Sequence, residues 1–247
     1  MMLRDKLIDT ATKLGVDDQL RRMRAAVLPR YKHDRVESEN LRKLLQSVLK
    51  EDSNCIDIGA YRGRVLAEIL RVAPRGKHIV YEPLPHLNKH LQERYPAIDI
   101  RLAAVSNEVG ETNFTYVKNI PAESGFHERF HSEDQQIEKL TVKTEALDRC
   151  LPAGYIPALI KIDVEGAERQ VFEGAIETIS RYKPVIIFEH GKGGAIYYDT
   201  QPQQIFELLN KQAGLRIFNM DGSGPYSLDQ FEEAFARDAS WDYVARP

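Results

Sequence analysis

From residue 54 onward, short apolar runs alternate with segments of helical periodicity, and this alternation limits the chain to few folds. Apolar runs bounded by turn residues indicate buried strands, and apolar residues spaced three and four apart indicate helices. The expected strands are 55–58, 78–82, 98–105, 114–117, 140–144, 159–164, 185–189, 216–220 and 241–245, and the expected helices are 65–72, 85–95, 168–180 and 203–213. Buried strands joined by helices form a mostly parallel sheet with right-handed crossovers, so the sequence predicts an α/β fold.

Two parts of the chain are expected to differ in structure. Residues 1–53 carry apolar residues at helical spacing, and we predict an N-terminal helical extension there, whereas residues 54–247 form the main domain. Within the extension, residues 21–35 hold six Lys and Arg against one Asp. Such a segment fits a solvated helix face, or a basic lid over an anionic substrate or lipid head group. An apolar helical extension also fits the interface of a homodimer.

The composition excludes several classes of protein. Lys and Arg number 34 against 37 Asp and Glu, a net charge of −3 that gives no general nucleic-acid footprint. Every apolar run is far shorter than the roughly 18 residues that indicate a transmembrane segment, and charges interrupt the first residues, unlike a signal peptide. Cys55 and Cys150 are too few for a disulfide scaffold or a four-cysteine zinc site. We therefore expect a soluble, cytoplasmic protein.

A glycine-containing turn follows the first expected strand, and an acid ends the second. Gly59 and Gly63 let the backbone turn sharply and approach a ligand closely, and Asp57 precedes them. Glu82 follows the apolar run 79–81, where a carboxylate accepts hydrogen bonds from two ribose hydroxyls. The turn reads G-x-x-x-G rather than the G-x-G-x-x-G that cradles a pyrophosphate, so the pattern favours S-adenosylmethionine (SAM) over a nicotinamide dinucleotide.

Six segments of the chain together resemble the FkbM-type SAM-dependent methyltransferases. They are CIDIGAYRGR, VYEPLPHL, LAAVSNEVGETNF, TEALD, LIKIDVEGAERQVFEGA and VIIFEH, and their order and spacing match the family over residues 54–190. The resemblance implies a class I methyltransferase fold, which is Rossmann-like, with a seven-stranded, mostly parallel sheet whose last strand is antiparallel. It also implies methylation of a hydroxyl on a sugar, glycolipid or secondary metabolite, with a small molecule or a glycan as the acceptor.

The resemblance further implies which residues bind SAM. The methionine part would lie against Asp57, Gly59 and Gly63. Glu82 would bind the ribose, and Ala104, near the end of the third strand, would lie close to the adenine. The other expected contacts are Ala60, Tyr61, Pro83 and Ser124. Ser124 belongs to a long polar stretch, residues 118–139, whose length indicates a mobile active-site loop.

Acidic residues gather where the expected strand 159–164 and the strand after it end. A hydroxyl acceptor has to lose a proton, which makes Asp163, at the strand tip, a candidate catalytic residue. His190 is a candidate base, with Glu189 orienting it. The alternative is a divalent cation such as Mg²⁺, held by Asp163, Glu165 and His190, which would lower the pKa of the hydroxyl.

Three other functions stay open at this point. An N-methyltransferase would need no base for an amine that is neutral near pH 7. A nicotinamide-dependent oxidoreductase would use the same ribose-binding acid, but its phosphate-binding glycine pattern is missing from the sequence. A non-catalytic SAM-binding or interaction module would bind the cofactor without turnover, and its basic N-terminal helices would dock an anionic partner.

Overall fold

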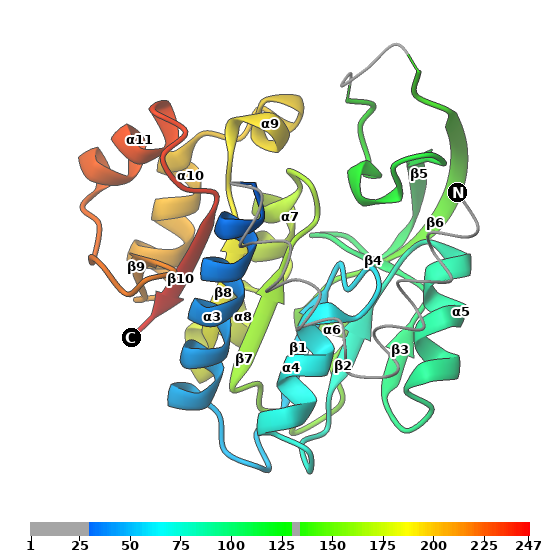
Figure 1. Ribbon diagram of the computed structural model, residues 1–247, viewed down its shortest axis with the longest axis horizontal. Helices are drawn as coiled ribbons and strands as arrows, with labels where there is room; N and C mark the ends of the chain where they lie inside the picture. Colours follow the sequence, from blue (N-terminus) through cyan, green and yellow to red (C-terminus); the bar gives the residue numbers. More distant parts are fainter. Residues whose placement is uncertain (1–29, 130–133) are drawn as a thin grey trace. The chain divides into compact units, whose positions relative to one another are not determined.

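The structure is a computed structural model of the 247-residue chain, and it describes residues 30–129 and 134–247 (Figure 1). The chain divides into two compact units, residues 1–44 and residues 45–247, and the second holds the sheets and the site. Helix α3 (Arg30–Val48) includes the boundary between the units. The helices expected before residue 30 lie outside the described residues. The domain boundary expected after residue 53 stays a prediction.

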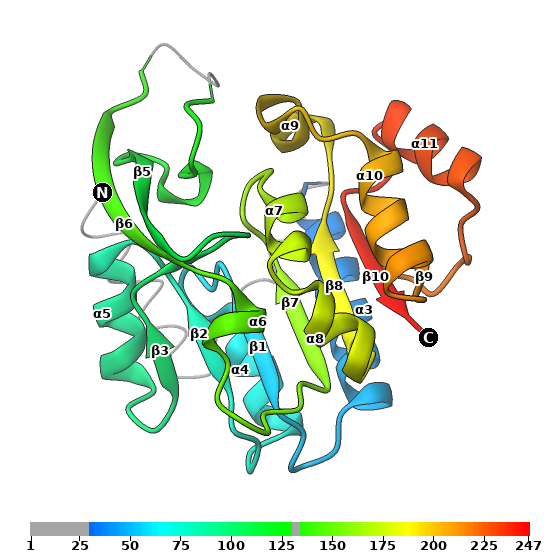
Figure 2. The ribbon, with the colours of Figure 1, turned by 180° about the vertical axis from the view of Figure 1, so that it is seen from behind.

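A seven-stranded sheet in the order β3-β2-β1-β7-β8-β10-β9 runs through the second unit (Figure 2). Its strands are β1 (Cys55–Ile58), β2 (Ile79–Tyr81), β3 (Asp99–Arg101), β7 (Leu159–Ile162), β8 (Val185–Glu189), β9 (Arg216–Asn219) and β10 (Asp242–Arg246). Neighbouring strands are parallel except at β10, which pairs antiparallel with both β8 and β9. The predicted fold is confirmed: the sheet is mostly parallel, and the last strand of the chain is antiparallel.

Helices connect these strands and cover both faces of the sheet (Figures 1 and 2). They are α4 (Arg64–Val72), α5 (Pro85–Arg94), α6 (Leu147–Cys150), α7 (Glu168–Glu173), α8 (Ile176–Tyr182), α9 (Lys192–Ala195), α10 (Pro202–Phe206) and α11 (Leu228–Ala236), with the 3-10 turns η1 (Pro121–Glu123) and η2 (Ile196–Tyr198) and the π-helix η3 (Glu207–Gln212). On one face, Leu66 of α4 and Leu91 of α5 pack with Val80 of β2. On the other face, Val171 of α7 and Ile179 of α8 belong to the larger core.

Alternation along β1 and β7 places two charged residues opposite each other. The isoleucines of both strands belong to the larger core, so the residues between them face the other way. Asp57 and Lys161 are these residues, and they are partners in the parallel register of β1 and β7. Both are buried, with exposed fractions of 1% for Asp57 and 6% for Lys161. A buried acid and a buried base therefore lie side by side below the ends of the two central strands.

A second sheet has three strands in the order β4-β6-β5: β4 (Ala104–Val105), β5 (Gly110–Val117) and β6 (Ile137–Glu145). The single strand expected at 98–105 is split between the two sheets, because the chain leaves β3 at Arg101 and joins β6 at β4. Part of the stretch expected to be a loop is built into this sheet. Thr115 and Gly125 exchange two backbone hydrogen bonds, of 2.7 and 3.1 Å, which fold the chain after β5 back onto that strand.

A polar cluster joins the two sheets. The hydroxyl of Tyr81, in β2, donates a hydrogen bond of 3.0 Å to Glu145, in β6. Arg101, in β3, donates from Nη1 to the same Glu145 oxygen and to the Tyr81 hydroxyl, both at 2.8 Å. The ring of Tyr81 is fully buried. The three side chains thus fix the smaller sheet to the β2–β3 edge of the larger one.

The helix expected at 168–180 is two helices, because the chain bends at Gly174. A Cβ atom at Gly174 would lie 2.1 Å from the carbonyl oxygen of Ser106, so a side chain has no room there. The Gly174 carbonyl accepts a hydrogen bond of 3.0 Å from the backbone N–H of Asp148. Helix α7 therefore ends before this contact, and α8 begins after it.

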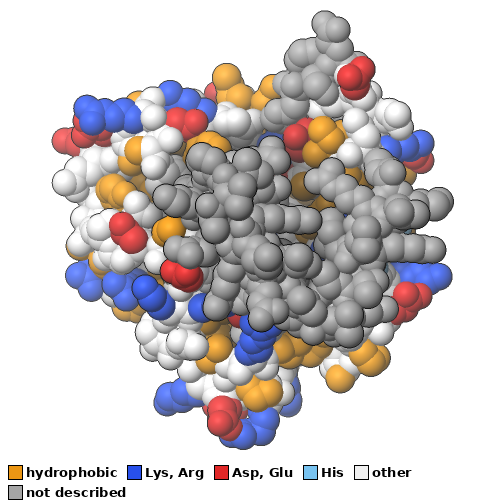
Figure 3. All heavy atoms as spheres, viewed as in Figure 1, with side chains coloured by type: hydrophobic (Ala, Val, Ile, Leu, Met, Phe, Trp, Pro, Cys, Tyr) orange, Lys and Arg blue, Asp and Glu red, His pale blue; other side chains and the backbone are white. Residues whose placement is uncertain are grey.

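The surface of the described residues carries charges of both signs. On the face drawn in Figure 3, Lys and Arg side chains lie among Asp and Glu side chains. Large apolar side chains are exposed beyond the end of β8, where Ile196 is 74% and Trp241 51% exposed. None of the described helices has the length and the apolar character that crossing a membrane requires.

Candidate active site

A pocket opens at the carboxyl ends of β1, β2 and β7 and extends to the smaller sheet. In open parallel sheets, ligands bind beyond the carboxyl ends of the strands. Its lining residues are Ile58, Gly59, Tyr61, Tyr81, Glu82, Pro83, Leu84, Leu87, Ala103, Ala104, Val105, Phe114, Pro121, Ala122, Ser124, Phe126, Asp163, Val164 and Glu165. The residues expected to bind SAM fall into two groups: Gly59, Tyr61, Glu82, Pro83, Ala104 and Ser124 line the pocket, whereas Asp57, Ala60 and Gly63 lie outside its lining.

The turn after β1 is held close to the chain that follows β7. Gly59 has a φ of +72°, and a Cβ atom on it would lie 1.8 Å from the carbonyl oxygen of Asp163. Both the left-handed backbone and the close approach require glycine at this position. The N–H groups of Gly59 and Ala60 donate to the carbonyl of Tyr81, at 3.0 and 3.2 Å, which ties the turn to β2 as well.

Glu82 presents its carboxylate to the pocket from the end of β2. The Oε2 atom accepts a hydrogen bond of 2.8 Å from the N–H of Tyr61, and Oε1 accepts one of 2.9 Å from the N–H of Leu84. Each oxygen keeps lone-pair capacity for a further donor. Burial raises the pKa of Glu82 to about 7, while these two backbone hydrogen bonds lower it. The carboxylate is thus fixed in orientation and faces a small ligand.

Lys161 connects the turn to the acid at the tip of β7. Its Nζ atom donates to the carbonyl oxygen of Gly59 at 2.7 Å and to that of Ile58 at 3.3 Å. The same atom lies 3.4 Å from Oδ1 of Asp57 and 3.3 Å from Oδ2 of Asp163. Asp163 is 40% exposed on its side chain and lines the pocket, so its carboxylate is both anchored and accessible.

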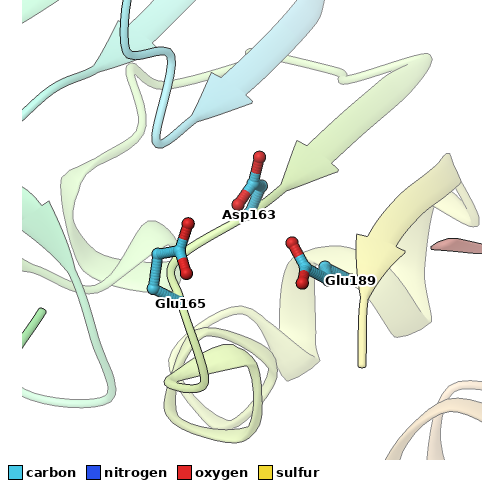
Figure 4. A group of neighbouring side chains, drawn as sticks. All are labelled: Asp163, Glu165 and Glu189. Carbon is cyan, nitrogen blue, oxygen red and sulfur yellow. The ribbon is translucent and has the colours of Figure 1, made fainter. Parts of the chain in front are cut away.

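Three carboxylates face one another next to the pocket (Figure 4). Asp163 and Glu165 follow β7, and Glu189 ends β8. One oxygen from each lies within 4.8 Å of the others. Glu165 has a φ of +60°, a conformation that a non-glycine residue rarely adopts, and it pairs at 2.5 Å with Arg129. Arg129 and Lys161 thus supply positive charge to this acid group, which consists of Asp163, Glu165 and Glu189.

Burial and mutual repulsion shift the pKa values of the acids in this region. Burial, with the charge of Asp163, raises the pKa of Glu165 to about 7 despite the nearby Arg129. Burial also raises the pKa of Glu168 to about 7, although the N–H groups of Gly166 and Val164 donate to its carboxylate. The pKa of Glu189 is raised further, first by burial and then by the surrounding carboxylates. A positive charge bound here would relieve this repulsion.

The raised pKa values predict that the ligand-free protein is less stable at pH 8 than at pH 6. These carboxyls keep protons in the folded state at pH values where the unfolded chain has lost them, so stability falls as pH rises through 7. Glu189→Gln should raise the melting temperature at pH 8 and reduce the difference between the two pH values. One pKa unit corresponds to about 1.4 kcal/mol, and we expect a gain of at least about 1 kcal/mol at pH 8.

Thermal melts of the wild type and the variant at both pH values measure this effect. Glu207→Gln, at an exposed position of η3, is the matched control and should leave the melting temperature unchanged. A Glu189→Gln variant that melts lower than the wild type at pH 8 would show that the ionised carboxylate is stabilising, contrary to the prediction.

His190 lies away from the acid group. Its side chain is 1% exposed, and its ring stacks on Phe235 and Phe231 at centroid distances of 4.8 and 5.8 Å. Both ring nitrogens lack a hydrogen-bond partner within the described part of the chain. Burial lowers the pKa of His190 to about 4. Consecutive residues along a strand face opposite sides, so His190, which follows Glu189 at the end of β8, faces the apolar core and Glu189 faces the other acids.

Arg129 and Tyr198 hold the site together. Arg129 is only 5% exposed, although it lies in the polar stretch expected to be a loop. The hydroxyl of Tyr198 accepts hydrogen bonds from the N–H of Phe126 at 2.9 Å and of His127 at 3.4 Å. Both contacts bridge segments far apart in the chain. Arg129 belongs to no local motif, so no sequence signal pointed to it.

The sheet order, with its antiparallel last strand, is that of a class I methyltransferase, and the pocket lies above the glycine turn at β1 and the acid at the end of β2. Residues 57–217 match the family model described as the methyltransferase FkbM domain. The chain belongs to this family. The resemblance inferred from the six sequence segments is thereby confirmed, and so is the assignment as a SAM-dependent enzyme.

Solved structures of methyltransferases are similar to the chain. The methyltransferase FkbM from Methylobacillus flagellatus KT matches with a TM-score of 0.50 and 16% identity, over 81% of this chain and 44% of that one. The chain thus spans less than half of that structure, and the similarity shows the fold.

Two further structures have lower TM-scores. The precorrin-6y C5,15-methyltransferase from Geobacter metallireducens GS-15 gives 0.39, with 17% identity over 72% of each chain. The plantazolicin methyltransferase BpumL, solved in complex with S-adenosylhomocysteine (SAH), gives 0.43, with 12% identity over 85% of this chain and 80% of that one. No curated protein matches the chain.

Proposed function

We propose that this methyltransferase transfers the methyl group of SAM to a hydroxyl oxygen of a small-molecule or glycan acceptor. The observation that carries the proposal is the Asp163 carboxylate, which lines the pocket, is 40% exposed and is anchored on one oxygen by Lys161. A hydroxyl group has to lose its proton as it is methylated, and an accessible carboxylate next to the methyl donor accepts that proton.

The residues of the pocket fit SAM. Glu82 offers a fixed carboxylate for the ribose hydroxyls, with both oxygens already oriented by backbone N–H groups. Leu87, Ala104 and Phe114 provide apolar surface for the adenine ring. The acid group beyond the Gly59 turn gives a negative environment to the sulfonium. The pocket therefore has matching groups for the ribose, the adenine and the sulfonium of the molecule.

SAM supplies an electrophilic methyl group on a positively charged sulfur, which keeps the bonding electron pair when the methyl leaves. The chain has to align the acceptor oxygen with that methyl, because an in-line displacement depends on geometry. Asp163 accepts the hydroxyl proton while the oxygen–carbon bond forms. Glu165 also lines the pocket and orients the acceptor, and Arg129 holds the Glu165 carboxylate in place.

A divalent cation such as Mg²⁺ is a second way to activate the hydroxyl, and we propose Asp163, Glu165 and Glu189 as its ligands. Carboxylate oxygens are the ligands that Mg²⁺ prefers, and these three converge within 4.8 Å. Glu189 takes the place that the sequence analysis gave to His190. Activity that disappears with EDTA and returns with Mg²⁺ would support the cation, whereas activity unaffected by EDTA would leave Asp163 acting alone.

The test is a panel of acceptors in which each hydroxyl compound has an amine counterpart of the same skeleton. SAM carrying a ¹³C-labelled methyl group is used, and NMR of the product identifies the atom that received the methyl. We expect O-methylated products. Products methylated only on nitrogen would contradict the proposal, and they would make the acid group a site for a cationic amine.

A further inference from the structure

Lys161 lies between two parts of the site with different tasks: the turn after β1 and the acid after β7. Its ammonium is buried and contacts the carbonyl oxygens of Gly59 and Ile58 together with the carboxylates of Asp57 and Asp163. All four groups belong to β1, its turn or the tip of β7. Three ammonium protons thus serve four oxygen acceptors, two of them negatively charged.

The positive charge of Lys161 balances the buried carboxylate of Asp57. Both carboxylate oxygens of Asp57 are buried, and the ammonium of Lys161, 3.4 Å from Oδ1, is their counter-charge. Lys161 also lowers the pKa of Glu82, so its field reaches the end of β2. Lys161 itself is outside the pocket lining, and it acts through the groups that it holds.

The order of the strands relates Lys161 to the cofactor. Glu82 ends β2, Gly59 follows β1 and Asp163 follows β7, and the strands are adjacent in the order β2-β1-β7. With the ribose at Glu82 and the acceptor at Asp163, the Gly59 turn between them would hold the sulfur and the amino-acid part of SAM. The Asp163 carbonyl occupies the space that a Cβ atom at Gly59 would need, so the turn and the strand tip are in direct contact.

We propose that Lys161 is a positioning residue, which holds the Gly59 turn and the Asp163 carboxylate in the places required by the amino-acid part of SAM and by the acceptor. The inference rests on the proposed function for the role of Asp163. Its part concerning the Gly59 turn depends only on cofactor binding. The simpler alternative is that Lys161 does no more than neutralise the buried Asp57.

Binding measurements on three variants separate these roles. Lys161→Met removes the ammonium and keeps the length of the side chain. Asp57→Asn removes the buried negative charge, and the double variant Lys161→Met/Asp57→Asn removes both charges together. Removing one partner of a buried pair leaves an uncompensated charge, whereas removing both avoids that penalty. The double variant therefore tests positioning in a protein whose buried charge is balanced.

Calorimetric titrations with SAH and with adenosine are the readout, together with thermal melts. Adenosine carries the ribose but lacks the amino-acid part. For Lys161→Met we expect SAH affinity to fall at least about tenfold, while adenosine affinity stays within about threefold of the wild type. The double variant should regain the melting temperature but not the SAH affinity. Lys183→Met is the matched control, since Lys183 also donates to a backbone carbonyl, that of Ala213, outside the pocket.

The inference is overturned if the double variant binds SAH as tightly as Asp57→Asn alone, because Lys161 would then only balance a charge. Equal losses for SAH and adenosine in Lys161→Met would also overturn it, since they indicate a general disturbance of the pocket. Because these titrations need no acceptor, they are independent of the product analysis. Methylation on nitrogen would contradict the proposed function and leave this result standing.

Discussion

Replacing Glu82 with alanine is expected to weaken the binding of SAH by about 100-fold or more. The carboxylate lines the pocket and is only 4% exposed, and its two oxygens are oriented by the N–H groups of Tyr61 and Leu84. A hydrogen bond to a charged group contributes about 1.5–3 kcal/mol, and two ribose hydroxyls would lose theirs. The substitution also leaves both backbone donors without a partner. Isothermal titration with SAH measures the change.

The pH dependence of the same titration supplies a second readout. The pKa of Glu82 is about 7, so the affinity of the wild type for SAH should decrease as the pH falls below that value. Glu82→Ala should lose this dependence. Glu93→Ala, an exposed position on α5, serves as the control and should bind like the wild type. If Glu82→Ala binds SAH as tightly as the wild type, the ribose does not bind at the end of β2.

Asp163→Asn is expected to reduce the rate of SAH formation roughly 100-fold or more, with SAH affinity within about threefold of the wild type. The amide has nearly the same shape as the carboxylate and still accepts a hydrogen bond from Lys161, but it cannot take up a proton from a hydroxyl. The loss should therefore appear in kcat. The assay follows SAH release with a hydroxyl acceptor identified in the panel.

Asp221→Asn is the control for this substitution, because Asp221 is an exposed acid after β9. It should leave the rate unchanged. Full activity of Asp163→Asn would show that another group receives the proton, or that the acceptor is an amine that needs no such group. Weak SAH binding in Asp163→Asn would instead assign the carboxylate to the cofactor.

The alternation of strands and helices was sufficient to predict a mostly parallel sheet, because each element is specified by its own short stretch of sequence. The seven strands and the antiparallel last strand followed from the resemblance to the FkbM family. The positions of Gly59 and Glu82 followed from the alternation, since each lies directly after a strand whose end could be recognised. The assignment of β4, β5 and β6 to a second sheet could not be predicted. The sheet to which a strand belongs depends on its pairing with distant segments. A local sequence pattern predicts a strand but does not indicate which other strand it pairs with.

Local sequence was also insufficient to predict parts of the candidate site. His190 and Glu189 are neighbours in sequence, but the end of β8 directs one into the apolar core and the other toward the acids. Whether the alternation of β8 continues to His190 depends on where the strand ends, and element boundaries are the least certain part of a sequence prediction. The pairing of Arg129 with Glu165 joins residues 36 positions apart, and nothing in their local sequence indicates it.

The pocket lies between two walls, and each wall is held by its own set of contacts. One wall consists of β1, β2 and β7, whose ends are locked together through Lys161 and the Gly59 turn, so that a change in one disturbs the others. The other wall is an outer flap formed by the hairpin of β5 and β6, which is joined to the β2–β3 edge by the cluster of Tyr81, Arg101 and Glu145. Substitutions along the hairpin can reshape the outer wall while the first wall keeps its geometry. Such changes would alter the apolar surface proposed for the adenine, of which Phe114 is a part, and would leave Glu82 and Asp163 in place.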